Sequence, residues 1–179
     1  MSDPLERLVI WPVAFSLREA LMKALSIRSD YVMDIFRGIK TVEYRSWSTK
    51  YRGDLLICGT AKKVPGGIPG YATCVAKLVG IDQYGAHDYG WRFAPFGPNG
   101  SYWIKPIPVK GQLGLFTVDD QLIVPAPIYG PKDAMAARWF TKVIAPLVYW
   151  KVILNIKPLS KEGLNTWKNS QRWSFPSSY

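Results

Sequence analysis

The chain has 179 residues, of which 48% are hydrophobic and 20% charged. This length suits one domain, and the composition predicts a folded chain rather than a disordered one. Lysine and arginine number 23 against 13 aspartates and glutamates, a net charge of +10. Such an excess favours polyanionic partners, namely nucleic acid or an anionic membrane surface, although positive charge can also serve solubility alone.

Several function classes are excluded by what the sequence lacks. No signal-peptide pattern is present, and the longest apolar run, residues 143–150, is too short to cross a bilayer, so we expect a cytoplasmic protein without a membrane partner. One histidine, His87, argues against a zinc site and a Ser-His-Asp mechanism. Cys58 and Cys74 lie in apolar segments and are expected to be buried thiols. No metal or cofactor is expected, because neither a phosphate loop nor a metal-ligand cluster occurs.

The chain opens with three predicted elements. Apolar residues at helical spacing predict an amphipathic helix within residues 1–23, and a short strand is expected over residues 24–27. A two-turn helix should follow, with Ser29 as its N-cap and Gly38 at the C′ position that closes it.

The middle of the chain predicts a sheet. Residues 85–100, rich in glycine, proline and aromatic residues, are expected to form a long functional or mobile loop. Pro106 and Pro108 place one strand at a sheet edge. Short strands joined by turns predict an α+β, β-rich fold, a closed or nearly closed barrel with one or two helices at its ends. The further expected strands are residues 41–45, 54–60, 71–82, 102–109 and 113–118.

The last part of the chain differs in charge. Residues 126–179 carry eight lysines and arginines against two acidic residues, so they hold +6 of the net +10. A helix within residues 133–155 is expected to pack on the barrel, and residues 157–172 to contact nucleic acid. We therefore predict a basic C-terminal extension over residues 125–179, packed on or beside the barrel.

Residues 38–47 carry the densest chemistry. In a strand over residues 41–45, the side chains of Glu43 and Arg45 share one face, and Lys40 at the preceding turn can reach either side. Burying these charges unpaired would be costly, so the strand is not a simple core strand. The alternative is a surface ion pair, worth about 1 kcal/mol or less.

The residues around this strand resemble the ASCH family. Three further blocks, residues 25–28, 51–57 and 107–116, resemble segments usual in that family, so that the likeness spans residues 24–124. The family signature G-x-K-x-x-E-x-R is met by Gly38, Lys40, Glu43 and Arg45.

The resemblance implies a PUA-like β-barrel over residues 24–124, with the signature residues lining a cleft. Members of the family are proposed to bind RNA or other nucleic acids. Some relatives are hydrolases: one branch removes the acetyl group of N4-acetylcytidine, and another member is a reported ribonuclease. The amidohydrolase branch has threonine where Glu43 stands here, so that only Lys40 and Arg45 match it.

Two hypotheses follow. In the first, the chain binds nucleic acid, RNA in preference to DNA, with cations on phosphates and aromatic rings on unpaired bases. In the second, it hydrolyses RNA or a modified nucleoside, with Lys40 and Glu43 as acid–base groups and Tyr102 as a further donor. The oligomeric state is left open. The predicted nucleic-acid contacts are Arg45, Trp47, Arg52, Lys62, Lys63, Ser101 and Trp103.

Overall fold

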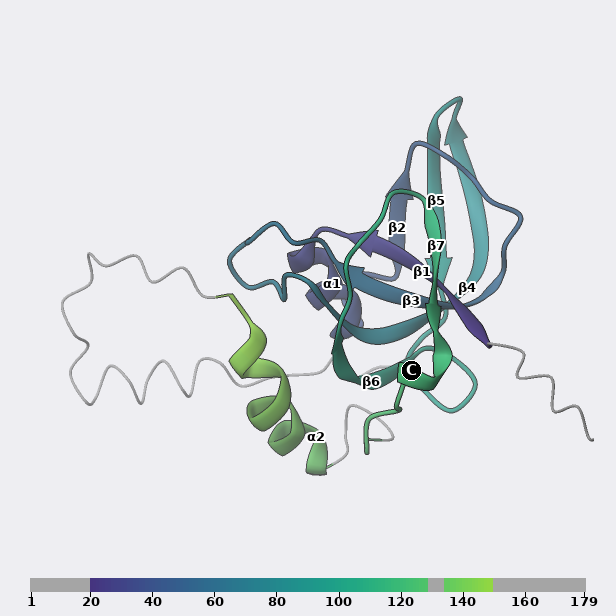
Figure 1. The fold of residues 1–179 in the computed structure, drawn as a ribbon. Helices are drawn as coiled ribbons and strands as arrows, with labels where there is room; N and C mark the ends of the chain where they lie inside the picture. Colours follow the sequence, from purple (N-terminus) through teal and green to yellow (C-terminus); the bar gives the residue numbers. More distant parts are fainter. Residues whose placement is uncertain (1–19, 129–133, 150–179) are drawn as a thin grey trace, which may run out of the picture.

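The structure is a computed structural model that describes residues 20–128 and 134–149 (Figure 1). Seven strands and two α-helices make up most of it. The strands are β1 (Leu21–Ile27), β2 (Val42–Arg45), β3 (Gly53–Gly59), β4 (Tyr71–Gly85), β5 (Asp88–Phe93), β6 (Tyr102–Pro108) and β7 (Leu115–Asp119). The helices are α1 (Ser29–Phe36) and α2 (Ala134–Trp139), with a 3-10 turn at Asp120–Leu122, and α2 continues as a π-helical turn (Phe140–Ile144) and a 3-10 turn (Ala145–Leu147).

The strands form one curved sheet in the order β2-β5-β4-β3-β1-β7, and β6 pairs with β4 beside this path. Among the strand pairs of the described residues, β1–β3 is parallel and the other five are antiparallel. The path has two ends, β2 and β7, so the sheet of the described residues is open, and the predicted closed barrel is not found. The long strand β4 pairs with β6 near Tyr71 and with β5 from Leu78 onward. A strand that changes partners along its length branches the sheet.

The core lies on both faces of the central strand β3. Leu55 and Ile57 belong to the larger apolar cluster, which also contains α1, whereas Leu56 and Cys58 belong to a second cluster with β6 and β7. A continuous apolar run is expected where both faces of a strand are buried. Both cysteines are free and buried, as predicted.

Helix α1 begins and ends where the sequence indicated, although one cap differs. Ser29 is the first helical residue and not the N-cap, because its hydroxyl donates instead to the carbonyl oxygen of Lys62 at 3.2 Å. Gly38 has a φ of 72°, and its N–H donates to the carbonyl oxygen of Ile35 at 2.8 Å. Glycine adopts this left-handed conformation without the steric cost of a Cβ, so the predicted C′ role is confirmed.

Two predicted elements are wrong in part. Strand β1 begins at Leu21, so the last residues of the helix expected within 1–23 are in a strand instead. Residues 1–19 of that expected helix lie outside the described residues. Strand β5 lies within the expected loop 85–100, and it forms a hairpin with β4 through the turn at residues 86–87. This strand alternates normally, since Trp91 is buried and Arg92 exposed, but its glycine and tyrosine obscured the pattern. The other predicted strands are found within a few residues of their expected bounds.

The segment after the sheet packs back on α1. The ring of Phe36 lies 6.2 Å from those of both Trp139 and Phe140, and the backbone of Tyr149 exchanges hydrogen bonds with Gly66 and Gly67. The predicted packing helix is therefore present over residues 134–147, while residues 150–179, which hold most of the basic extension, lie outside the description. None of the helices in the described ranges has the length and hydropathy of a membrane span.

Candidate functional site

Three charged side chains converge where β2 follows α1. One oxygen of the Glu43 carboxylate, Oε2, lies 3.3 Å from Nζ of Lys40, and the other, Oε1, lies 3.2 Å from Nη2 of Arg45. Because Glu43 and Arg45 are two residues apart in a strand, they point to the same side, as the alternation predicted. We call these three residues the charged cluster.

The charged cluster is sheltered but reachable from solvent. The side chain of Glu43 is 8% exposed, against 19% for Lys40 and 21% for Arg45. A buried carboxylate is stable only when paired, and here both of its oxygens are engaged by cations. Two cations sharing one anion leave the charged cluster with a net charge of +1, which suits an anionic ligand.

Arg45 also ties the charged cluster to the sheet. Its Nη2 donates to the carbonyl oxygen of Ser26 in β1 at 2.8 Å. Burial lowers the pKa of the Arg45 guanidinium, and the charge of Glu43 opposes this shift. The Nε of Arg45 is buried and has no hydrogen-bond partner among the described residues.

Lys40 sits between two tyrosine rings. Its Nζ lies 5.1 Å from the ring centroid of Tyr31 in α1 and 5.4 Å from that of Tyr44 in β2, both within cation–π range. Both rings were absent from the predicted site. The alternation of β2 gave a signal for Tyr44, because a strand that turns Glu43 inward turns its neighbour outward.

Two predicted contact residues are interior. Ser101 is 1% exposed, and its hydroxyl donates to the carbonyl oxygen of Ala94 at 2.6 Å and accepts from the N–H of Lys77 at 3.1 Å. Trp103 is 5% exposed, and its Nε1 donates to the carbonyl oxygen of Phe36 at 2.9 Å. Buried polar groups with such partners stabilise the fold, so we remove both residues from the candidate site.

Two other predicted aromatic residues are half-buried. The ring of Trp47 packs edge-to-face on Trp91 with centroids 4.7 Å apart, and its carbonyl oxygen accepts from Nε1 of Trp91. Tyr102 lies on β6, which pairs with β4 rather than with β2, and it borders an apolar pocket of about 340 Å³ whose lining includes no member of the charged cluster. Burial raises the pKa of the Tyr102 hydroxyl. The predicted grouping of Tyr102 with Lys40 and Glu43 is thus not seen in the structure.

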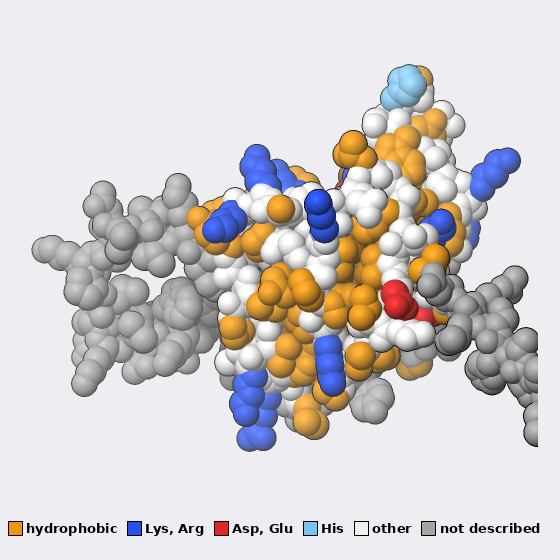
Figure 2. Space-filling view, viewed as in Figure 1, with side chains coloured by type: hydrophobic (Ala, Val, Ile, Leu, Met, Phe, Trp, Pro, Cys, Tyr) orange, Lys and Arg blue, Asp and Glu red, His pale blue; other side chains and the backbone are white. Residues whose placement is uncertain are grey.

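The remaining predicted cations are exposed. Lys62 and Lys63 lie on the loop after β3, which contacts the start of α1 through the bond from Ser29 to the Lys62 carbonyl. Arg52 precedes β3, and its Nη1 donates to the carbonyl oxygens of Thr49 and Tyr51. On the face that Figure 2 shows, lysine and arginine side chains lie both at the edge and toward the middle, and few acidic ones appear. The described residues contain no group of three or more His, Cys, Asp or Glu side chains that could hold a metal ion.

An open, mostly antiparallel sheet with one helix before a Lys–Glu–Arg cluster defines a small α+β protein with a basic site. The sequence model of the ASCH domain family matches residues 25–146, more than half of the chain, so the chain belongs to this family. The ASCH domain is PUA-like, and this fold is associated with RNA binding. The match extends beyond the boundary predicted at residue 124. A comparison with curated proteins finds no match.

Proposed function

We propose that the protein binds RNA through the charged cluster. The observation that carries this proposal is the sharing of one buried carboxylate by Lys40 and Arg45, which leaves a surplus positive charge on two side chains that solvent can still reach. Glu43 holds both cations in place, and a phosphate or base oxygen of a bound nucleotide contacts the solvent-reachable parts of Lys40 and Arg45. Membership of the ASCH family supports RNA as the ligand in preference to DNA.

The exposed cations extend the proposed site. Lys62 and Lys63 lie on the loop at the start of α1, and Arg52 is exposed before β3. In this proposal they contact phosphates without reading sequence, so they add affinity that weakens with salt. The basic C-terminal extension, the boundaries 24–124 and a cytoplasmic location stay predictions.

The test is an equilibrium RNA-binding assay. Fluorescence anisotropy with a labelled single-stranded RNA should show a loss of affinity of about tenfold or more for Arg45→Ala, because a hydrogen bond to a charged group contributes roughly 1.5–3 kcal/mol. The matched control is Arg138→Ala, which removes an exposed arginine of α2. Equal affinities of the wild type and a folded Arg45→Ala variant would contradict the proposal.

A hydrolase is the second candidate, favoured by the 3.3 Å contact between Lys40 and Glu43, which resembles an acid–base couple. Against it, the Glu43 carboxylate is engaged at both oxygens, which leaves little room for a catalytic water. Denaturing gels of the same RNA and chromatography of N4-acetylcytidine distinguish the two functions. Product that disappears with Lys40→Ala would establish the hydrolase, and intact RNA would leave binding alone.

A further inference from the structure

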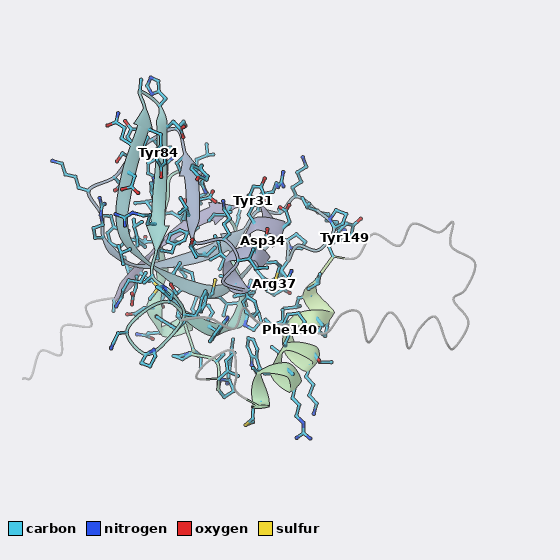
Figure 3. The ribbon with its side chains drawn as sticks, turned by 180° about the vertical axis from the view of Figure 1, so that it is seen from behind. Tyr31, Asp34, Arg37, Tyr84, Phe140 and Tyr149 are labelled. Atoms are coloured by element: carbon cyan, nitrogen blue, oxygen red, sulfur yellow. The ribbon has the colours of Figure 1, made fainter. Side chains whose placement is uncertain are left out.

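A row of exposed tyrosines runs beside the charged cluster. Tyr31 in α1 is 38% exposed, while Tyr44 in β2 and Tyr84 in β4 are each 59% exposed. Seen from behind, Tyr84 lies on the projecting β4–β5 hairpin and Tyr31 on α1, on the same side of the ribbon (Figure 3). Elements far apart in sequence thus bring three rings to one surface.

The rings are linked by contacts and alternate with cations. The guanidinium carbon of Arg28 lies 4.0 Å from the ring centroid of Tyr31, and Nζ of Lys40 lies between the rings of Tyr31 and Tyr44. The centroids of Tyr44 and Tyr84 are 6.1 Å apart at an interplanar angle of 44°. The order along the surface is therefore Arg28, Tyr31, Lys40, Tyr44, Tyr84.

The sheet accommodates this row through a glycine. Tyr44 pairs with Gly90 across the β2–β5 ladder, and a Cβ at Gly90 would lie 2.7 Å from Cε2 of Tyr84 and 3.1 Å from Cγ1 of Val42. The ring of Tyr84 thus occupies the space that a side chain at Gly90 would take. Without a side chain there, the Tyr84 ring can approach Tyr44 over the backbone.

The charge around the row suits a polyanion. Two acidic side chains near it are paired with arginines: Asp30 with Arg28 at 2.7 Å, and Asp82 with Arg92 at 2.8 Å. Hydrogen bonding and the charge of Arg28 lower the pKa of Asp30 against the opposing effect of its burial. These two acids are paired, whereas Asp34 of α1 also acts on Arg28; the charged cluster adds a charge of +1 beside the row.

We propose that Tyr31, Tyr44 and Tyr84 form a stacking surface for unpaired nucleotides of a single-stranded nucleic acid whose phosphates contact Lys40. This inference rests on the proposed RNA binding and adds the strand state and the residues that hold the bases. Aromatic rings alternating with cations are what single strands need, since every base has a face that stacks and every nucleotide a phosphate. A duplex keeps its bases stacked on each other and offers none to these rings.

The test compares ring removal with ring retention. The probe is a fluorescein-labelled oligouridylate of about 15 nucleotides, alone or annealed to its complement, within the range of site sizes of single-strand binders. Tyr44→Ala and Tyr84→Ala should each weaken binding of the single strand roughly 5- to 100-fold, because stacking contributes about 1–3 kcal/mol per base. Tyr44→Phe and Tyr84→Phe should bind within about twofold of the wild type, because they keep the ring.

A matched control removes an exposed apolar side chain elsewhere. Leu122 is 56% exposed in the 3-10 turn after β7, and Leu122→Ala should bind as the wild type does. Substitutions of exposed residues usually change stability by no more than about 0.5 kcal/mol, and thermal unfolding of each variant verifies this. If Tyr84 serves only to cover Gly90, Tyr84→Ala unfolds at a lower temperature but binds RNA normally, which overturns the inference.

The outcomes separate the two proposals. If binding is lost with Arg45→Ala but unchanged by the tyrosine substitutions, the stacking surface is overturned and RNA binding stands. The same conclusion follows if the duplex binds more tightly than the single strand. A wild type that retains no nucleic acid overturns both. Weaker single-strand binding by the alanine variants, with wild-type binding by the phenylalanine variants, supports the stacking surface.

Discussion

The two sides of strand β2 show how four residues can separate two kinds of binding chemistry. On the inner side, Glu43 and Arg45 are buried or half-buried and fixed by ion pairs at 3.3 Å or less. On the outer side, Tyr44 is 59% exposed and meets Tyr84 at 6.1 Å. Strand alternation forces this separation.

The charged residues on the inner side depend on one another to be stable, whereas the tyrosine ring on the outer side does not depend on its neighbours in this way. The charged cluster needs its three partners together, because one carboxylate offsets the desolvation of two cations. The tyrosines need little from each other, since each ring is a separate apolar face. Lys40 touches both groups, as it reaches Glu43 on one side and the rings of Tyr31 and Tyr44 on the other.

The largest effect on stability should come from removing the carboxylate of Glu43 on the inner side of β2. Glu43→Ala leaves two neighbouring cations without their anion, and we expect it to lower the free energy of unfolding by about 3 kcal/mol. Urea denaturation monitored by tryptophan fluorescence measures this. Glu43→Gln, which keeps the acceptor oxygen but not the charge, should cost less. An alanine variant as stable as the wild type would show that the carboxylate does not hold the charged cluster together.

A second substitution sharpens the contrast between inner and outer aromatic residues. Trp103→Phe leaves the carbonyl oxygen of Phe36 without its donor and removes buried volume, so the free energy of unfolding should fall by about 2 kcal/mol. RNA affinity of the folded variant should be unchanged, in contrast to Tyr44→Ala. Loss of RNA affinity at full folding would return Trp103 to the candidate site.

Salt dependence separates the charges from the rings more finely. For a single strand, each phosphate neutralised adds about 0.7 to the slope of log affinity against log salt concentration. Lys40→Ala should reduce the slope by about this amount, and Tyr84→Ala should lower affinity with the slope unchanged. Anisotropy titrations over a series of salt concentrations provide both values. Equal slopes for the wild type and Lys40→Ala would exclude a phosphate contact at Lys40.

The smallest effect concerns the two interior thiols. Burial raises the pKa of Cys58 from 9.0 to about 12 and also raises that of Cys74. Reaction with a thiol-specific chromogenic reagent at mildly alkaline pH should therefore be negligible until the chain unfolds. Since these folded-state pKa values are raised, the thiols' contribution to stability is complete below pH 9 and falls as the pH rises above it, where only the unfolded thiols ionise. Fast labelling of the native protein would show that the core opens readily.

Apolar segments bounded by turn residues made most of the fold predictable. Strands β3 and β6 could be predicted because burial restricts their residues to apolar types. The end of α1 could be predicted because the left-handed conformation after it favours glycine, here Gly38. The bounds of β1 could not be predicted. Strand β5 could not be predicted because Gly90 and the neighbouring tyrosine are residue types that are also typical of loops. Whether the sheet closes was not predictable either, because pairing between strands distant in sequence, such as the change of partners along β4, leaves no local pattern.

The sequence by itself determined the charged cluster, since Lys40, Glu43 and Arg45 are close along the chain and strand alternation turns two of them to one face. Only the tertiary structure decided which distant residues surround it. Tyr31 reaches Lys40 through the packing of α1, and Tyr84 reaches Tyr44 through the hairpin, whereas Ser101 and Trp103 face the interior. The physical reason is that local spacing fixes the direction of a side chain, while its exposure depends on what packs against it from elsewhere in the chain.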